Sequence, residues 1–177
     1  MKSVTIQPLN RTEFADYGHV IDVPDKISGS NANYGTATRF NHLTSLVNKR
    51  ISDAIPNLCI FRVKPASLPF NIKLLERHNY SSQMFIPMTS SPARYLVVVA
   101  KNDPISDKPD FNTLKVFLAS STQAFNYHPG TWHHPMIGLD SVIDFVCLVH
   151  EASNNLDCEE VFFSKDPWQA VLPSSKL

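Results

Sequence analysis

The sequence contains little charge and no net charge. Charged residues make up 18% of the 177 residues, and 16 basic side chains balance 16 acidic ones. Lysine and arginine form no cluster along the chain. Proteins that bind nucleic acid or anionic membranes electrostatically carry basic patches, so we expect neither kind of partner. The sequence also lacks a run of about eighteen apolar residues, the length that a membrane-spanning helix requires.

Cysteine is rare, and its three positions argue against two kinds of site. The spacing of Cys59, Cys147 and Cys158 matches no zinc pattern, and an odd number makes a poor disulfide framework. Cys59 and Cys147 lie in apolar runs and are predicted to be small buried side chains. Cys158 is flanked by carboxylates, which raise the pKa of a thiol, so it is a poor candidate for a nucleophile.

Glycine is scarce as well, with five residues against thirteen prolines, as in a β-protein with stiff connections. The chain instead contains apolar or alternating runs of about four to seven residues, the length of strands. These runs are Leu58–Val63, Ile72–Leu75, Tyr95–Ala100, Lys115–Ala119, Ile143–Val149 and Glu160–Phe163. The pattern predicts one all-β domain over residues 1–177, a β-barrel or jelly roll.

One short helix is predicted near the start of this domain. Asn10 is a suitable N-cap for a helix over Arg11–Tyr17, with Gly18 just past its end. A further turn or short helix is expected over Asn154–Glu159. The polar stretch Asn102–Asp110 is predicted to be a loop.

The first polar segment that stands out is Glu76–Gln83, which follows a predicted strand. Residues two apart on a strand point to the same face, so Glu76 and His78 would enter one pocket together if that face is the barrel interior. Gln83, on the next strand, could join them. The alternative is an exterior face on which Glu76 and His78 are solvated.

The second polar segment is Asn126–Pro135, which contains three of the seven histidines. Pro129-Gly130 predicts a tight turn. His133 and His134 are adjacent, so only one of them can easily face the interior of a strand-built barrel. The alternative is a turn with solvent-facing histidines. Histidine suits proton transfer near neutral pH and is a common metal ligand.

The spacing of these residues resembles that of cupin barrels, whose two motifs are His-x-His-x4-Glu and Pro-x-Gly-x2-His. Here the motifs become Glu76-x-His78-x4-Gln83 and His128-x-Gly130-x2-His133, with three of six residue types changed. The resemblance implies a metal bound through Glu76, His78, Gln83 and His133, with the last three as the main ligands. Gln83 would be a weak neutral ligand, and Ni, Mn and Zn fit equally well.

The longer motifs resemble the ureidoglycolate lyase family over residues 33–163. They are Asn33–Phe40, Leu75–His78, Ser82–Pro87, Tyr127–His134 and Asp144–Val146. This resemblance implies a cupin fold, a homodimer, and cleavage of ureidoglycolate to glyoxylate and urea, a late step of purine breakdown through allantoin.

That reaction needs a base for the substrate hydroxyl and an acid for the leaving urea nitrogen. We expect His133 and His78 to line the reacting centre, with Glu76 orienting or polarising one of them. His128 is a second candidate for the base.

A cation must also hold the substrate carboxylate. Arg39 is the first candidate for this role, because its planar fork matches two carboxylate oxygens. Arg77 is expected to face away from Glu76 and His78. Gln83 is predicted to donate a hydrogen bond to the ureido carbonyl. Trp132 is predicted either to wall the pocket or to be a core residue.

The sequence is also compatible with other functions. The barrel could carry a different cupin enzyme, such as an isomerase or dioxygenase, a binding module without turnover, or an amidohydrolase that releases ammonia. The residues Ser175-Lys176-Leu177 match the carboxyl-terminal address read by a peroxisomal import receptor. In a eukaryote we therefore expect a peroxisomal protein, with the cytoplasm as the alternative.

Overall fold

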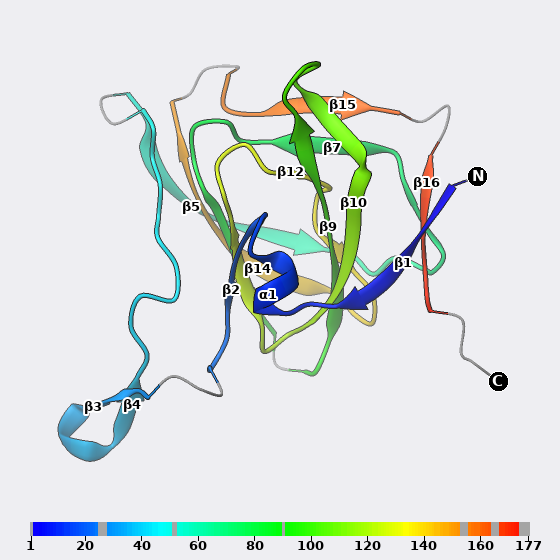
Figure 1. The fold of residues 1–177 in the computed structure, drawn as a ribbon. Helices are drawn as coiled ribbons and strands as arrows, with labels where there is room; N and C mark the ends of the chain where they lie inside the picture. Colours follow the sequence, from blue (N-terminus) through cyan, green and yellow to red (C-terminus); the bar gives the residue numbers. More distant parts are fainter. Residues whose placement is uncertain are drawn as a thin grey trace.

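The computed structural model describes residues 2–24, 28–50, 53–89, 91–152, 156–163 and 167–173. Two large curled sheets face each other and a small hairpin projects from them (Figure 1). The predicted all-β, barrel-like fold is therefore confirmed. No described helix has the length and apolar character needed to cross a membrane.

The larger sheet has nine strands. Their order is β15 (Glu159–Phe162), β7 (Leu74–Arg77), β12 (Trp132–His133), β9 (Arg94–Asp103), β10 (Lys108–Ser120), β1 (Lys2–Pro8), β16 (Trp168–Val171) and β6 (Phe70–Ile72), with β13 (Ile137–Gly138) also beside β9. Most neighbouring pairs are antiparallel, but β1 runs parallel to both β10 and β16.

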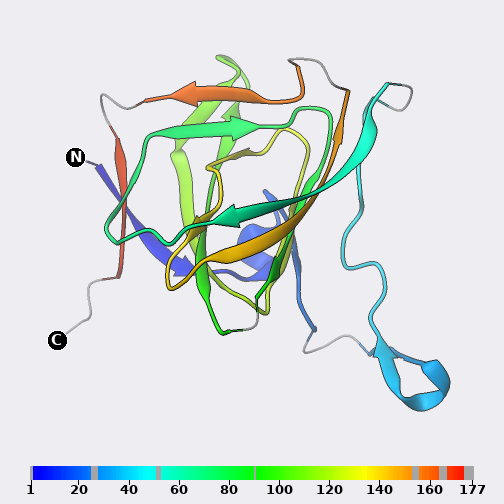
Figure 2. The same cartoon turned by 180° about the vertical axis from the view of Figure 1, so that it is seen from behind.

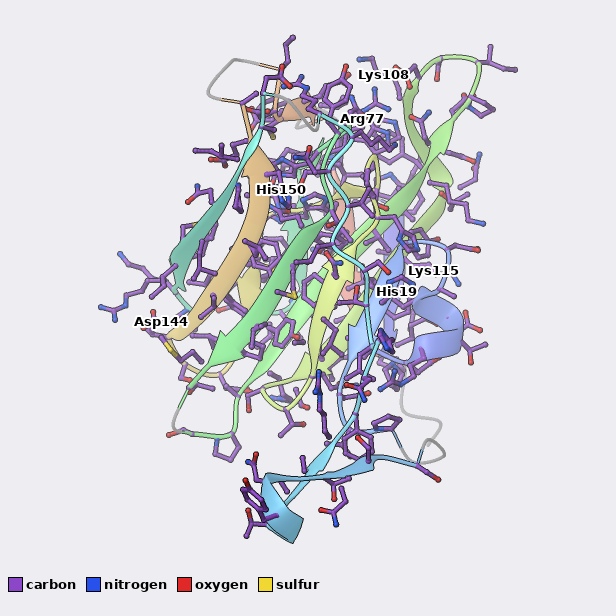
Figure 3. The ribbon with its side chains drawn as sticks, turned by 90° about the vertical axis from the view of Figure 1, so that its left-hand side faces the viewer. His19, Arg77, Lys108, Lys115, Asp144 and His150 are labelled. Atoms are coloured by element: carbon purple, nitrogen blue, oxygen red, sulfur yellow. The ribbon has the colours of Figure 1, made fainter. Side chains whose placement is uncertain are left out.

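The smaller sheet has five strands, seen side by side in Figure 3. Their order is β2 (Gly18–Ile21), β11 (Ala124–Tyr127), β8 (Gln83–Met88), β14 (Ile143–Glu151) and β5 (Ile55–Val63). The projecting hairpin consists of β3 (Ser30–Ala32), the 3₁₀ turn η1 (Asn33–Gly35) and β4 (Ala37–Arg39).

Two of the expected element boundaries are wrong. The run Ile72–Leu75 is divided at Lys73, where β6 ends and β7 begins in another part of the sheet. The predicted loop Asn102–Asp110 mostly continues β9 and β10, which pair from Asp103 opposite Lys108 and turn between them. Backbone pairing extends these strands beyond the core despite their polar side chains, because strand propensity depends strongly on context.

The short helix α1 (Arg11–Phe14) begins as expected, since the Asn10 side chain accepts a hydrogen bond from the backbone of Glu13. It ends three residues earlier than predicted. Gly18 already belongs to β2, where a Cβ atom would lie only 2.1 Å from the carbonyl oxygen of Asn126. Glycine is therefore needed at this position for close strand packing rather than for ending the helix. The predicted turn over Asn154–Glu159 lies partly outside the described residues.

Strand β9 is buried on both faces and separates two hydrophobic cores. Val97 and Val99 point into the barrel, between the two large sheets. Leu96, Val98 and Ala100 point into a second core on the other side of β9. Successive side chains of a strand alternate between faces, so each residue paired with β9 has a defined side. This alternation positions the polar residues described below.

The outer face of the smaller sheet is unusually apolar. The exposed fractions of Leu58 and Ile60 on β5 are 70% and 59%. Ile60 lies beside Val146 of β14, which in turn lies beside Ile86 of β8, so these side chains form one outward row. Figure 2 shows β5 and β14 from behind, with the β3–β4 hairpin projecting away from the barrel at the lower right. Contiguous exposed apolar surface of this kind typically marks an interaction site.

Candidate active site

One row of paired residues brings a histidine and a carboxylate into the barrel. His133 of β12 lies between Val99 of β9 and Glu76 of β7. Because Val99 faces the barrel core, His133 and Glu76 face it too. The Nε2 atom of His133 lies 3.5 Å from Oε1 of Glu76. This Nε2 atom is buried and has no hydrogen-bond partner of acceptable geometry among the residues that the structure describes.

His78 joins this pair from the residue just beyond β7. Its ring lies parallel to that of His133, with 5.7 Å between the centroids. Burial, and the nearby His133, lower the pKa of His78 to about 4, so His78 is neutral at pH 7. Its Nδ1 lies 2.9 Å from the carbonyl oxygen of Asp157 and must donate to it. The lone pair of a neutral His78 is therefore on Nε2.

His133 is oriented in the same way. Its Nδ1 lies 2.9 Å from the carbonyl oxygen of Thr131, so Nδ1 donates and Nε2 is left for the interior. Burial raises the pKa of Glu76, but the attractions to His133, His78 and His134 together outweigh burial and lower that pKa overall. Glu76 is therefore a carboxylate at neutral pH, next to two imidazole rings.

These three residues fit a divalent metal. The candidate ligand atoms of Glu76, His78 and His133 all lie within 4.8 Å of one another. Two imidazoles and one carboxylate suit Zn, Ni, Mn or Fe, and each imidazole is fixed by a backbone carbonyl, as metal-binding histidines usually are. The unpartnered Nε2 of His133 is a further observation in favour of a ligand.

Gln83 and Tyr127 line the barrel interior from the opposite sheet. They are directly paired across β8 and β11. The Tyr127 ring is stacked on the ring of His133, with 4.1 Å between the centroids. Both side chains are buried, and within the described part of the chain neither the Tyr127 hydroxyl nor Gln83 Oε1 has a hydrogen-bond partner. Burial, with the charge of Glu76, raises the pKa of Tyr127 well above its usual value.

Trp132 and Arg77 lie on the other side of the larger sheet. The Trp132 indole is fully buried in the second core, and its Nε1 donates to Asn102 Oδ1 at 2.9 Å. The Arg77 guanidinium carbon lies 4.4 Å from the centre of the Trp132 ring. Both residues alternate with the inward-facing His133 and Glu76, so the structure does not bring Trp132 to the histidine cluster.

His128 and Arg39 are also away from the cluster. The His128 ring contacts His19 edge-on, and its Nε2 lies 3.2 Å from the carbonyl oxygen of Ala15. It lines a separate open depression of about 200 Å³ with Asp16. Arg39 is exposed on β4 of the projecting hairpin. It could reach substrate only if the hairpin moved or a second copy of the chain presented it.

Two side chains near the cluster have no individual role that the sequence predicts. Tyr127 was part of the second motif, but an aromatic residue on a barrel strand is most often simply core. Arg50 pairs with Asp157, whose backbone carbonyl accepts from His78, and its guanidinium lies 4.0 Å above the Tyr80 ring. Nothing in the sequence around Arg50 signals this placement, which depends on contacts between distant segments.

Comparison with known proteins places this chain in an enzyme family. The family model described as ureidoglycolate lyase matches residues 1–171. A protein of Pseudomonas fluorescens Pf-5 named ureidoglycolate lyase is 34% identical over 173 residues, which are 98% of this chain and 99% of the relative. A protein of Pseudomonas aeruginosa PAO1 with the same name is 35% identical over 179 aligned residues, covering 99% of each chain. The chain therefore belongs to the ureidoglycolate lyase family.

Proposed function

We propose that this protein cleaves ureidoglycolate to glyoxylate and urea. The observation that carries the proposal is the buried cluster of Glu76, His78 and His133 inside the barrel. It lies in a chain that matches the ureidoglycolate lyase family over almost its whole length. The comparisons name ureidoglycolate lyases, and none of them favours a module that only binds a small molecule.

The chemistry requires two proton transfers. The substrate hydroxyl loses its proton as its oxygen forms the glyoxylate carbonyl, the carbon–nitrogen bond breaks, and the leaving nitrogen takes the electron pair and a proton. His78, neutral with a free Nε2 lone pair, is suited to accept the hydroxyl proton. His133 serves as the acid when it carries a proton on Nε2 as well as on Nδ1, and the leaving nitrogen would receive that Nε2 proton, which lies next to the Glu76 carboxylate.

We propose a divalent metal held by His78, His133 and Glu76 as the alternative arrangement of the same cluster, in which the two imidazole Nε2 atoms would be ligands instead of proton-transfer groups. A bound metal would supply Lewis-acid polarisation of a substrate oxygen. Gln83 was expected to be a ligand together with Glu76, His78 and His133; our proposal keeps the last three, whose ligand atoms form the cluster, and leaves Gln83 out. Elemental analysis of the purified protein should find Ni, Mn or Zn near one per chain, and His133→Ala should lower that content; a metal-free, fully active protein would contradict this proposal.

The reaction can be tested by its products. Incubation with ureidoglycolate should release glyoxylate and urea in equal amounts, above the spontaneous rate measured without protein. Urea should be measured directly, without urease, so that ammonia released by the protein itself is not masked. Ammonia without urea would identify an amidohydrolase, and an absence of glyoxylate above the blank would end the assignment as a lyase.

We also propose that the protein is a homodimer formed through the outer face of the smaller sheet. Leu58 and Ile60 lie exposed on that face, and a flat apolar patch can pair with a copy of itself about a two-fold axis. Light scattering should give about twice the chain mass of 19.9 kDa. Ile60→Glu should yield monomer, whereas Ile105→Glu, at an exposed position on the distant β9–β10 turn, should not. An unchanged mass for Ile60→Glu would rule out this face.

The peroxisomal location remains a proposal. Its basis is the tripeptide Ser175-Lys176-Leu177, which lies outside the described residues. It would act as an import address where it forms the carboxyl terminus of the protein in a eukaryotic cell. Deleting these three residues should then move a fluorescent fusion, tagged at the amino terminus, from peroxisomes to the cytosol.

A further inference from the structure

Two buried polar atoms of the barrel interior lie outside the proton-transfer cluster and form no hydrogen bond with any residue that the structure describes. They are Oε1 of Gln83 and the hydroxyl oxygen of Tyr127. Their residues are only 4% and 1% exposed. Buried polar atoms are nearly always paired, and one left unpaired destabilises the fold unless something binds to it. Two such atoms on neighbouring side chains therefore indicate a ligand.

The two residues face the same space. Tyr127 of β11 is directly opposite Gln83 of β8, so both side chains leave the sheet on the same side. That side is the barrel interior, because Gln83 is also paired with Val149, a member of the barrel core. The Tyr127 ring is stacked on His133 of the proton-transfer cluster. A molecule that reacts at His133 would thus have Tyr127 and Gln83 beside it.

A third unpartnered atom, Oδ1 of Asn126, does not belong to this pair. Asn126 alternates with Tyr127 on β11 and faces the other way. Its Nδ2 donates to Thr44 Oγ1 at 2.8 Å and to the carbonyl oxygen of Ser45 at 3.0 Å. The inward pair is therefore distinct from the outward-facing contacts of the same strand.

The surroundings decide which partner each atom needs. Burial raises the pKa of the Cys147 thiol on the adjacent strand β14, and Gln83 partly offsets this, as an amide N–H directed toward that sulfur would. Oε1 is the Gln83 amide atom left without a partner among the described residues, and an amide oxygen is an acceptor. The Tyr127 hydroxyl is a neutral phenol, so it has a proton to donate. The pair presents one acceptor and one donor, next to each other.

We infer that Tyr127 and Gln83 recognise the ureido group of the substrate. The Tyr127 hydroxyl donates to the ureido carbonyl oxygen, and Gln83 Oε1 accepts from the terminal NH₂ group. One edge of a urea group presents the complementary pattern. Its carbonyl oxygen is an acceptor for the Tyr127 hydroxyl, and the adjacent N–H is a donor to Gln83 Oε1. Gln83 thus acts as an acceptor for the terminal amine rather than as the donor to the carbonyl that the sequence suggested. This inference rests on the proposed function, because it concerns the same site.

The test uses two substrates that differ only at the terminal group. N-acetyl-α-hydroxyglycine keeps the carbonyl and the reacting carbon of ureidoglycolate but has a methyl group in place of NH₂. Both release glyoxylate, so one assay serves for both. For each protein we take the ratio of kcat/KM for ureidoglycolate to kcat/KM for the acetyl analogue. Dividing the ratio of a variant by that of the wild-type protein cancels the intrinsic difference in reactivity between the two substrates.

Gln83→Leu should lower kcat/KM for ureidoglycolate by about tenfold or more and leave the acetyl analogue little changed, because only the former loses a hydrogen bond. The preference for ureidoglycolate should fall by the same factor. Tyr127→Phe keeps the ring stacked on His133 and removes only the hydroxyl. It should lower kcat/KM for both substrates by a similar factor, about tenfold, and leave the ratio unchanged.

Tyr95→Phe is a matched control, because Tyr95 is another buried tyrosine of the barrel whose hydroxyl donates to the backbone of Gln123. It should leave both kcat/KM values near wild type. Thermal melts show whether each variant is folded. An unchanged ratio in folded Gln83→Leu, or wild-type kinetics in Tyr127→Phe, would overturn the inference. Wild-type protein that cleaves neither substrate would instead overturn the proposed function itself.

Discussion

Replacing His133 with alanine is expected to lower kcat/KM for ureidoglycolate by about 10²- to 10⁴-fold, the usual loss for a proton-transfer group. The Nε2 atom that lies 3.5 Å from Glu76 would be gone, whether it transfers a proton or holds a metal. The strand itself should persist, because the backbone pairs of His133 with Glu76 and Val99 do not depend on the imidazole. Steady-state assays and circular dichroism would measure both effects.

His134→Ala is the matched control for this prediction. His134 is the next residue along the chain, but its Nδ1 lies 2.7 Å from the carbonyl oxygen of Pro135 and its ring contacts the edge of Phe70. It lies outside the group formed by Glu76, His78 and His133. We expect His134→Ala to keep most of the activity. Comparable losses in the two variants, or a fully active His133→Ala, would remove His133 from the mechanism.

Arg77→Met is expected to destabilise the protein by about 3 kcal/mol, or roughly 6 to 12 °C in Tm, without altering the reacting groups directly. The Arg77 side chain is only 5% exposed and pairs with both Asp107 and Glu159. Its guanidinium also lies over the Trp132 ring. Methionine retains the apolar stem but leaves the acceptors of this network without their shared donor. Thermal or urea unfolding would measure the loss.

Arg94→Met provides the comparison for Arg77. Arg94 makes a similar two-pronged pair with Asp140, but its side chain is 58% exposed. Water replaces such contacts readily, so this variant should change Tm much less. If Arg77→Met and Arg94→Met shifted Tm equally, burial would not be what gives the Arg77 network its importance.

Part of the site follows from local rules of the chain. Glu76 and His78 are two residues apart, so a strand in this region places them on one face and Arg77 on the other, as the structure has them. Likewise only one of His133 and His134 was expected to face inward. Neither rule says which face of the strand is interior. Side chains alternate with a period of two residues whether the polar face is buried or exposed to solvent.

The structure decides that question through β9, which is buried on both faces. The side chains on both faces of β9 are apolar. The residue types of this strand therefore do not show which face lies in the barrel core and which lies in the second core. The pairing of Val99 with His133 places His133 on the face of the barrel core. Trp132, the preceding residue, therefore lies on the opposite face, in the second core. Trp132 was for this reason a candidate for the pocket wall, although it packs under Arg77.

The sequence alone determined the all-β class, the Asn10 cap, and the spacing of Glu76, His78 and His133, because these depend on side-chain type and on periodicity along a few residues. Only the tertiary structure shows that Tyr127 lies beside His133 and Gln83. It also shows that Arg39 and His128 lie away from these residues. Those relations join strands that are distant along the chain. They are set by cross-strand register and by which face each sheet buries, and neither can be read from a single segment.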